Sequence, residues 1–182
     1  MRLVLLDRDG VLNADRPDSV KSPAELAMIP GAAGAVRRLN EAGLLVAVCT
    51  NQGVVGRRII DEPMLERIHD KLRGELAREG ARLDALFQCC DPPDAPGPRR
   101  KPAPGMLREA MARFRVPPHE TVMIGDALVD LEAAAAAGCR RMLLRTGKGR
   151  QTQAAGIPAH VLPAAVHEDL PAAVEALLGP RA

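Results

Sequence analysis

The chain has 182 residues, 47% of them hydrophobic, and a formal net charge of +2. A chain of this length can bury most of its apolar surface in one core, so a single domain over residues 1–182 is predicted. Basic residues are scattered among acidic ones, and the only aromatic residues are Phe87 and Phe114. Because nucleic-acid-binding proteins gather basic residues and offer rings for stacking, the composition excludes nucleic acid as a partner.

The sequence contains no segment typical of a membrane protein. No stretch approaches the roughly 20 apolar residues of a membrane span. The first apolar run enters an acidic loop after residue 6, which is not typical of a signal peptide. Cys49, Cys89, Cys90 and Cys139 have neither disulfide-framework nor C-x-x-C spacing. We therefore expect a cytoplasmic protein with reduced thiols and no membrane partner.

The order of the predicted elements indicates an α/β fold. Short apolar runs predict buried strands at residues 3–6, 44–49, 83–87, 122–124 and 142–144. Apolar periodicity and capping residues predict helices at residues 32–42, 62–79, 104–115, 128–137 and 170–178, followed by a frayed tail at residues 179–182. Asp61 is the predicted N-cap of the second helix. This alternation predicts a parallel sheet with right-handed crossovers and a ligand site beyond the carboxyl ends of its strands.

Two loops are longer than a minimal connection between elements. Residues 13–30 are polar and interrupted by prolines, and residues 90–104 contain six prolines. Long loops at the ligand edge of such a sheet usually shape the substrate pocket. Neither loop is large enough to form a separate cap domain, so we expect an open pocket.

Four polar clusters follow or lie near the predicted strands, in an order that indicates phosphoryl transfer. They are Asp7-Arg8-Asp9-Gly10-Val11, Thr50-Asn51-Gln52, Arg100-Lys101-Pro102, and Gly125-Asp126 with Asp130. Together they supply a nucleophile, a proton shuttle, a phosphate clamp and a seat for a divalent cation. Because parallel strands end at one edge of a sheet, we expect the clusters to converge on one site.

Asp7 and Asp9 are the predicted catalytic carboxylates. Their spacing lets both side chains face the same region if the chain stays extended. An ionised Asp7 can attack phosphorus without a base, while Asp9 can protonate the leaving oxygen and later take a proton from water. The alternative interpretation is that this Asp-x-Asp sequence is only a turn or a helix cap.

Thr50, Lys101, Asp126 and Asp130 complete the predicted site. The Thr50 hydroxyl can bind phosphoryl oxygens, and Lys101 can neutralise charge on the phosphoryl group and on Asp7. Carboxylate oxygens from Asp126 and Asp130 suit Mg²⁺. Taken singly, each residue has another explanation. Thr50 could be a cap at the end of a strand, and Lys101 could be a solvated surface lysine. Asp126 could be a helix N-cap, with Asp130 as an acid in the first turn of that helix.

The scarcity of lysine gives Lys101 some additional weight. Lysine occurs only at positions 21, 71, 101 and 148, among 25 basic residues. Where arginine fills most basic positions, a lysine inside a motif indicates a need for a compact charge on a flexible stem.

These motifs resemble, in order, the four motifs of the haloacid dehalogenase superfamily of phosphohydrolases, over nearly the whole chain. More narrowly, the sequence resembles the D-glycero-D-manno-heptose 1,7-bisphosphate phosphatases and their relatives, the histidinol-phosphate phosphatases. The segments that carry this narrower resemblance are residues 6–11 with Asn13, Thr50-Asn51-Gln52, Arg100-Lys101-Pro102, Pro104-Gly105-Met106 and Arg145-Thr146-Gly147. The resemblance implies a Rossmann-like three-layer sandwich with a central parallel sheet and a minimal cap.

The resemblance also implies Mg²⁺-dependent hydrolysis through an aspartyl-phosphate. Asp7 would be the nucleophile and a metal ligand, and Asp9 the general acid and base with its backbone carbonyl on the metal. Asp126 would be the remaining metal ligand, supported by Asp130. The residues implied to stabilise the phosphoryl group are Thr50 and Lys101. The residues implied to bind the substrate are Asp15, Arg16, Pro17, Asp18, Asn51, Gln52, Gly53 and Arg100.

Three departures from the family pattern concern the periphery of the site. Family members commonly hold zinc before the Arg-Lys-Pro motif, but this loop offers only Cys89 and Cys90, without a histidine or a later cysteine. Four tetrahedral ligands are not available, so we expect no structural zinc. In residues 50–58, Gly53 replaces a serine of the family, and Ala127 replaces a lysine that often follows the metal aspartate.

The resemblance predicts removal of the 7-phosphate of a heptose bisphosphate, for lipopolysaccharide precursors, with a phosphorylated sugar as the small-molecule partner. The alternatives among enzymes are a histidinol-phosphate phosphatase and a less selective phosphatase of small metabolites. Two alternatives are not enzymes. A phosphoacceptor switch would keep a long-lived phospho-Asp7 and would lack an equivalent of Asp9. A non-catalytic sugar-phosphate binder would show no turnover. The sequence favours a monomer without determining the oligomeric state.

Overall fold

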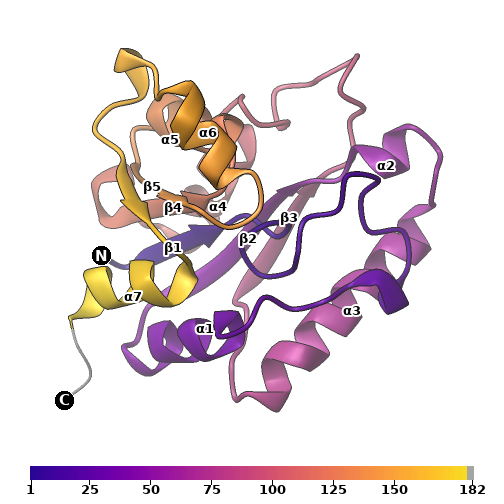
Figure 1. The fold of residues 1–182 in the computed structure, drawn as a ribbon, viewed down its shortest axis with the longest axis horizontal. Helices are drawn as coiled ribbons and strands as arrows, with labels where there is room; N and C mark the ends of the chain where they lie inside the picture. The colour runs from indigo at the N-terminus through magenta and orange to yellow at the C-terminus, as the bar shows by residue number, and fades with distance from the viewer. Residues whose placement is uncertain (180–182) are drawn as a thin grey trace.

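The computed structural model describes residues 1–179. In this part of the chain, parallel strands form a sheet in the order β3-β2-β1-β4-β5-β6 (Figure 1). The strands are β1 (Leu3–Leu6), β2 (Leu45–Asn51), β3 (Ala85–Cys89), β4 (Thr121–Gly125), β5 (Arg140–Leu144) and β6 (Ala165–His167). The chain order reverses at β1, which pairs with both β2 and β4. In open parallel sheets, ligands bind beyond the carboxyl ends of the strands at such a reversal.

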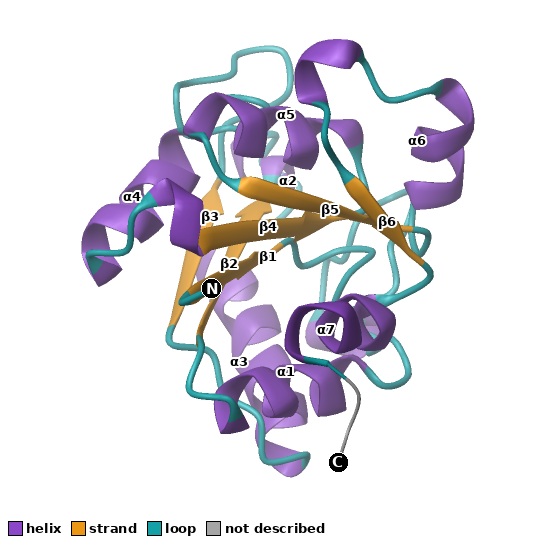
Figure 2. Ribbon diagram, turned by 90° about the vertical axis from the view of Figure 1, so that its left-hand side faces the viewer, coloured by secondary structure: helices purple, strands orange, loops and turns teal. Residues whose placement is uncertain are grey.

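Helices cover both faces of the sheet and complete three layers. One face is covered by α1 (Ala32–Glu41), α3 (Glu62–Arg78) and α7 (Leu170–Leu178), and the other by α4 (Gly105–Phe114) and α5 (Leu128–Ala137) (Figure 2). The shorter helices are α2 (Gly53–Gly56), α6 (Gly149–Ala155) and the 3-10 helices Pro23–Glu25, Pro118–Glu120 and Ala159–Val161. The predicted α/β three-layer sandwich is confirmed.

The central strand β1 contributes side chains to both halves of the core. Leu3 and Leu5 pack in the cluster that contains Met106 of α4, whereas Val4 and Leu6 pack in the cluster that contains Ile68 of α3. Successive side chains of a strand point to opposite faces, so an uninterrupted apolar run fits a strand buried on both sides. This burial anchors β1 and thereby fixes the position of the residues that follow it.

All the predicted strands and helices are present, with ends within two residues of the predicted ones. Asp61 caps α3 as predicted, because its carboxylate accepts a hydrogen bond from the Met64 amide at 2.9 Å. The sequence analysis missed β6, α2 and α6, which are too short to show a clear periodicity. Of the predicted C-terminal tail, residues 180–182 lie outside the described part of the chain.

Neither long loop forms a cap domain. Within residues 1–179, the connection after β1 contains only the 3-10 helix Pro23–Glu25, and residues 90–104 contain no helix. The predicted minimal cap is therefore confirmed. Over the same range, no helix combines the length and apolar character needed to cross a bilayer.

Candidate active site

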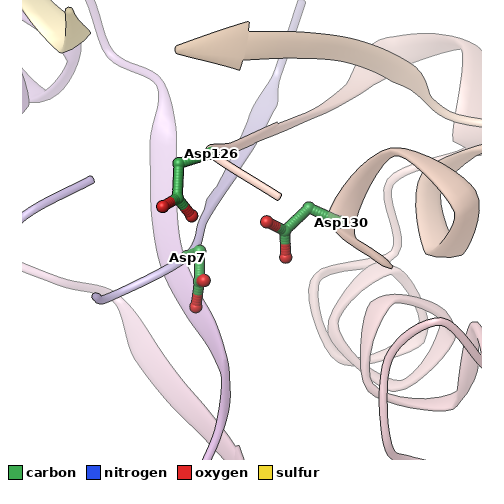
Figure 3. Close-up of side chains that lie close together, drawn as sticks. All are labelled: Asp7, Asp126 and Asp130. Atoms are coloured by element: carbon green, nitrogen blue, oxygen red, sulfur yellow. The ribbon is translucent and has the colours of Figure 1, made fainter. Parts of the chain in front are cut away.

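Three carboxylates converge at the carboxyl edge of the sheet. Asp7 directly follows β1, Asp126 directly follows the neighbouring strand β4, and Asp130 lies in the first turn of α5. One carboxylate oxygen of each residue lies within 4.8 Å of the others, and Figure 3 shows the three side chains close together. Oxygen-only clusters of this kind suit a hard divalent cation.

Lys101 provides the positive charge beside this cluster. Its ammonium nitrogen lies 3.0 Å from Asp7 Oδ1 and 2.6 Å from Asp130 Oδ1, and it donates to the Cys49 carbonyl at 2.7 Å. Burial alone would lower the pKa of Lys101, but the charges of Asp130 and Asp7 outweigh this effect and raise the pKa. Lys101 is therefore a permanent cation at the floor of the site.

The loop that carries Lys101 is tied to the end of β2. The Asn51 amide donates to the Lys101 carbonyl at 2.9 Å, and its oxygen accepts from the Lys101 backbone N–H at 3.1 Å. These reciprocal bonds join two motifs that are 50 residues apart. Asn51 thus has a structural role in placing Lys101, and it also lines the cavity described below.

Asp7 and Asp126 are incompletely neutralised in the protein by itself. Burial raises the pKa of Asp7 to about 6, with the Lys101 charge opposing the shift. Burial, together with the charges of Asp130 and Asp7, raises the pKa of Asp126 to about 8. Two carboxyl groups with raised pKa values around a shared space match the donor set of a cation site, because a bound cation would supply the missing charge.

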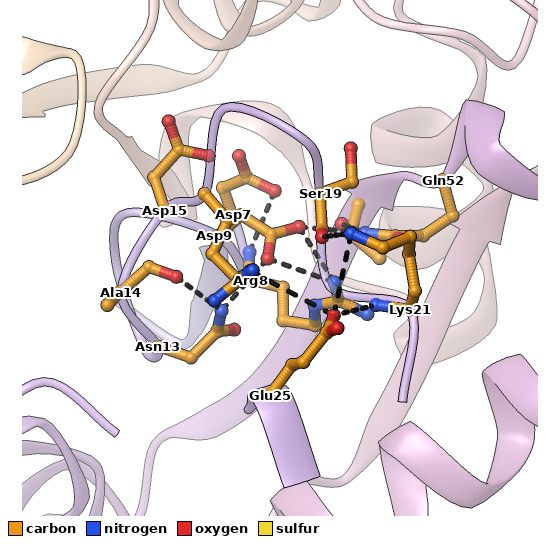
Figure 4. A network of polar contacts seen from close by, with 12 residues as sticks. Asp7, Arg8, Asp9, Asn13, Ala14, Asp15, Ser19, Lys21, Glu25 and Gln52 are labelled. Atoms are coloured by element: carbon orange, nitrogen blue, oxygen red, sulfur yellow. Dashed lines mark hydrogen bonds and ion pairs between the residues drawn. The ribbon is translucent and has the colours of Figure 1, made fainter. Parts of the chain in front are cut away.

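Asp9 occupies a different environment from Asp7, although the two residues are neighbours in one loop. Both Asp9 oxygens accept from Arg8 Nη2 at 2.9 Å, while Asn13 and Gln52 each donate to one oxygen at 2.9 Å (Figure 4). Burial opposes ionisation, but the Arg8 charge and these hydrogen bonds lower the pKa of Asp9. The site therefore contains two adjacent carboxyl groups with opposite pKa shifts.

Two glycines let the surrounding loops approach Asp126. A Cβ atom on Gly10 or on Gly147 would lie 2.1 Å from Asp126 Oδ2, and both residues have positive φ values, of +80° and +52°. Thr146 donates to the Gly10 carbonyl at 2.6 Å, and the Lys148 amide donates to Asp126 Oδ2 at 2.8 Å. The loop after β5 therefore closes directly over the Asp126 carboxylate.

A cavity of about 260 Å³ opens above these groups. It is bordered by the catalytic candidates Asp7, Asp9 and Lys101 and by Asp126. The other predicted residues that line it are Asp15, Arg16, Pro17, Asn51, Gly53 and Arg100. Four cationic side chains line the cavity besides Lys101, namely Arg16, Arg57, Arg100 and Lys148. Such a lining suits a ligand with more than one anionic group.

Four predicted residues do not line this cavity. Thr50 and Gln52 are buried, and the Gln52 amide donates to the Thr50 hydroxyl at 2.8 Å as well as to Asp9. Asp18 pairs with Lys21 and Arg16 on an exposed loop. Asp130 is buried behind Lys101. Gln52 and Asp130 thus contact the catalytic candidates from outside the cavity.

The sequence analysis did not assign Arg57 or Lys148 to the pocket. Lys148 also pairs with Asp15 at 3.3 Å, so it links the loop after β5 to the loop after β1. The same scarcity of lysine that drew attention to Lys101 applies to Lys148. Its position, one residue after the motif Arg145-Thr146-Gly147, was a second available signal.

Comparisons with known proteins agree with this geometry. A HAD-hydrolase-like family model matches residues 98–173. A D-glycero-beta-D-manno-heptose-1,7-bisphosphate 7-phosphatase from Bordetella bronchiseptica is 44% identical over 98% of this chain and 98% of its own. One from Pseudomonas aeruginosa is 39% identical over 97% of each chain. The crystal structure of the D,D-heptose 1,7-bisphosphate phosphatase from B. bronchiseptica, complexed with magnesium and phosphate, matches with a TM-score of 0.92 and covers 98% of both chains.

The fold, the carboxylate cluster and these similarities define a phosphatase of the haloacid dehalogenase superfamily, an enzyme that hydrolyses phosphoric monoesters. Both relatives match this chain over almost its full length, at identities well above those that indicate a shared fold alone. The chain belongs to the D-glycero-D-manno-heptose-1,7-bisphosphate 7-phosphatase family. The resemblance found from the motifs is thereby confirmed.

Proposed function

We propose that this enzyme removes the 7-phosphate of D-glycero-β-D-manno-heptose 1,7-bisphosphate, with Mg²⁺ as cofactor. One observation carries the proposal: the Asp7 carboxylate borders the cavity, beside Lys101 and close to Asp126. This is where a phosphoryl group would be attacked. The choice of substrate and of the β anomer follows the names of the relatives.

The proposed reaction has two steps. An oxygen of Asp7 attacks phosphorus, and the bond between phosphorus and the sugar oxygen breaks as Asp9 protonates that oxygen. Water then attacks the aspartyl-phosphate, Asp9 takes a proton from the water, and inorganic phosphate leaves. Asp9 therefore carries a proton at the start of the first step, and its lowered pKa favours the carboxylate that accepts the water proton in the second step.

The metal-binding assignment rests on the carboxylate cluster. Asp7, Asp126 and the Asp9 backbone carbonyl would hold Mg²⁺, and Asp130 would act indirectly through its ion pair with Lys101. When bound, Mg²⁺ would neutralise charge on the transferred phosphoryl group. Thr50 is buried beside the cavity and does not line it, and the hydrogen bond from Gln52 would leave the Thr50 hydroxyl proton free to donate to a phosphoryl oxygen.

The second phosphate of the substrate fits the cationic lining of the cavity. Arg100 donates to the Asp91 carbonyl at 2.7 Å, which fixes its guanidinium at the cavity wall. We propose that Arg100 recognises the substrate. We also propose that the loop before Arg100 holds no structural zinc. Finally, we propose that the chain is a single-domain enzyme that acts as a monomer in the cytoplasm.

The proposal is tested by comparing kcat/KM for phosphate release with Mg²⁺ from a panel of substrates. The panel contains both anomers of the heptose 1,7-bisphosphate, histidinol phosphate, fructose 1,6-bisphosphate and a nucleotide. We expect the β anomer to be preferred by about 100-fold or more, an energy difference of about 2.7 kcal/mol. A flat profile would contradict the substrate assignment and leave a general phosphatase, whereas phosphorylation without turnover would contradict hydrolysis itself.

The raised pKa values predict that the metal-free protein loses stability as pH rises. Asp7 and Asp126 have a usual pKa of 3.8 and folded values of about 6 and about 8. In this range the folded state binds more protons than the unfolded state, so the free energy of unfolding falls as pH rises from about 5 to about 8, by about 1 kcal/mol or more. Thermal unfolding in a chelator should show a lower Tm at pH 8 than at pH 5.

Added Mg²⁺ should remove this loss, because cation binding requires the deprotonated carboxylates and strengthens as pH rises. The matched control is Asp126→Asn, which should flatten the pH dependence of Tm in chelator. A Tm that rises between pH 5 and pH 8 in the metal-free wild type, but not in this variant, would contradict the prediction.

Gly147→Ala should weaken cation binding. The new Cβ would lie 2.1 Å from Asp126 Oδ2, so either the carboxylate or the loop must shift. We expect the Mg²⁺ concentration for half-maximal activity to rise, and kcat/KM to fall by about 100-fold, as is typical when catalytic groups are displaced by about 1 Å. The matched control is Gly43→Ala, where φ is +75° and nothing lies within 4 Å of the new atom. Equal effects of both substitutions would assign the loss to backbone strain alone.

A further inference from the structure

Arg8 is a charged side chain placed wholly inside the protein. It follows Asp7 in the chain, yet its side chain has an exposed fraction of 0%. Its guanidinium bonds to two groups: Nη2 to both oxygens of Asp9, as seen in Figure 4, and Nη1 to His69 Nε2 at 3.2 Å. His69 belongs to α3 and is itself fully buried. A helix on one face of the sheet is thus connected to the Asp9 carboxylate.

The direction of the bond between Arg8 and His69 follows from their charges. Burial, with the charges of Arg8 and Arg73, lowers the pKa of His69 to about 3, so the imidazole is neutral. Arg8 can only donate, so His69 Nε2 accepts and the ring proton is on Nδ1. That nitrogen lies 4.0 Å from a Glu66 carboxylate oxygen. His69 is therefore held as one tautomer whose acceptor faces Arg8.

We propose that His69 is a positioning residue that acts through Arg8 to set the orientation of the Asp9 carboxylate for proton transfer to the leaving oxygen. This inference rests on the proposed function, because it takes Asp9 as the general acid and base. Arg8 is the intermediate group and touches Asp9 but not the substrate cavity.

The geometry explains why Arg8 needs a second anchor. Its long side chain has several rotatable bonds, and Arg8 Nε has no hydrogen-bond partner within residues 1–179. Without His69, Nη1 would be a buried donor with no acceptor, which costs about 1–3 kcal/mol and favours a shift of the guanidinium. Both Asp9 oxygens bond to the same nitrogen of Arg8, so such a shift would rotate or displace the carboxylate.

The test compares two variants of matched chemistry. In His69→Gln the side-chain amide reaches about as far as imidazole Nε2 and can still accept from Arg8. In His69→Asn the same amide is one methylene shorter and cannot reach Nη1. His69→Leu serves as a second variant without any acceptor. The Tm of each variant is measured first, so that kinetic data refer to folded protein.

The kinetic measurement is kcat/KM on two substrates that differ in their need for an acid. The alcohol oxygen of a sugar phosphate must be protonated as it leaves, whereas the acidic phenol of p-nitrophenyl phosphate leaves without help. We expect His69→Asn to lower kcat/KM on the sugar phosphate by about 10- to 100-fold, part of the usual contribution of general acid catalysis, and on p-nitrophenyl phosphate by less than about 3-fold. His69→Gln should stay within about 3-fold of the wild type on both substrates.

Several outcomes would overturn the inference. The role would be rejected if His69→Asn lost equal activity on both substrates, or if its activity were unchanged. It would also be rejected if His69→Gln lost as much activity as His69→Asn. Failure of both His69→Asn and His69→Leu to fold would assign His69 to the core and would also reject the role. Failure of the proposed substrate would be visible in the wild-type enzyme and is therefore distinguishable from failure of this inference. If the wild type does not hydrolyse the heptose bisphosphate, the His69 variants are compared on another alkyl phosphate of the panel that the wild type does hydrolyse.

Discussion

Asp7→Asn is expected to lower kcat by about 10⁴-fold or more, the scale seen when a nucleophile that works with other catalytic groups is removed. The amide oxygen of asparagine carries no charge and does not form an acyl-phosphate. The fold should be retained, because Lys101 keeps its ion pair with Asp130 at 2.6 Å. The measurements are steady-state phosphate release and borohydride trapping of the aspartyl-phosphate during turnover of the wild type.

The matched control is Asp94→Asn, which makes the same chemical change at an exposed residue of the long loop before α4. It should leave kcat within about 3-fold of the wild type, as expected for a surface substitution outside the site. In chelator at pH 8, Asp7→Asn should have a Tm equal to or above that of the wild type, since it removes one of the mutually repelling carboxylates. Phosphate release by Asp7→Asn at more than a trace rate would refute the nucleophile assignment.

Lys101→Met should damage both activity and stability. Methionine has a similar length but leaves Asp7 and Asp130 buried without the cation that neutralises them. Breaking a buried pair by removing one partner costs about 3–5 kcal/mol. We expect this loss in the free energy of unfolding at pH 8 from urea titration, together with a fall in kcat/KM of about 1,000-fold, because the phosphoryl group also loses its clamp.

The loss of stability in Lys101→Met should shrink at lower pH. Without Lys101, the charge that opposes the burial of Asp7 is gone, so the folded pKa of Asp7 stays above the usual 3.8 and the folded state takes up a proton before the unfolded state does. Protonation removes the unpaired charges, and the difference from the wild type should be smaller at pH 5 than at pH 8. Adding Asp130→Asn should recover part of the loss at pH 8.

Lys71→Met is the control for Lys101→Met. Lys71 forms an ion pair with Glu75 on the surface of α3 and is more than one third exposed. Its replacement should change stability by less than about 1 kcal/mol, as is usual for surface pairs. If both lysine variants lost equal stability, or if Lys101→Met became less stable at low pH, the buried ion pair would not be the cause.

The sequence alone determined strands β1 to β5, the longer helices and the residue types at the strand ends. The apolar run at residues 3–6, the Asp61 cap and the glycine after α5 are local signals, and each depends on a few neighbouring residues. The alternation of strands and helices predicted a parallel sheet, and it therefore implied that the four motifs lie at the same edge of that sheet. For this reason Asp7, Asp9, Lys101 and Asp126 could be named from sequence, and the structure brings them together.

Only the tertiary structure decided which polar groups form hydrogen bonds with each other. Gln52 was expected to contact substrate, but its amide is buried against Asp9 and Thr50. His69 appeared in the sequence as one residue of an amphipathic helix, and nothing local connects it to Arg8, which is 61 residues away. Such contacts depend on how α3 packs against β1, which local periodicity does not specify.

The same reason applies to the loop after β5. Gly147 was part of a recognised motif, but the sequence did not show its role, which is to let the loop close over Asp126 because it has no side chain. The Lys148 amide reaches a carboxylate 22 residues earlier in the chain. The sequence determined which groups are available, through local propensity and strand order, whereas long-range packing decided which of them meet, because those distances are set by the whole core.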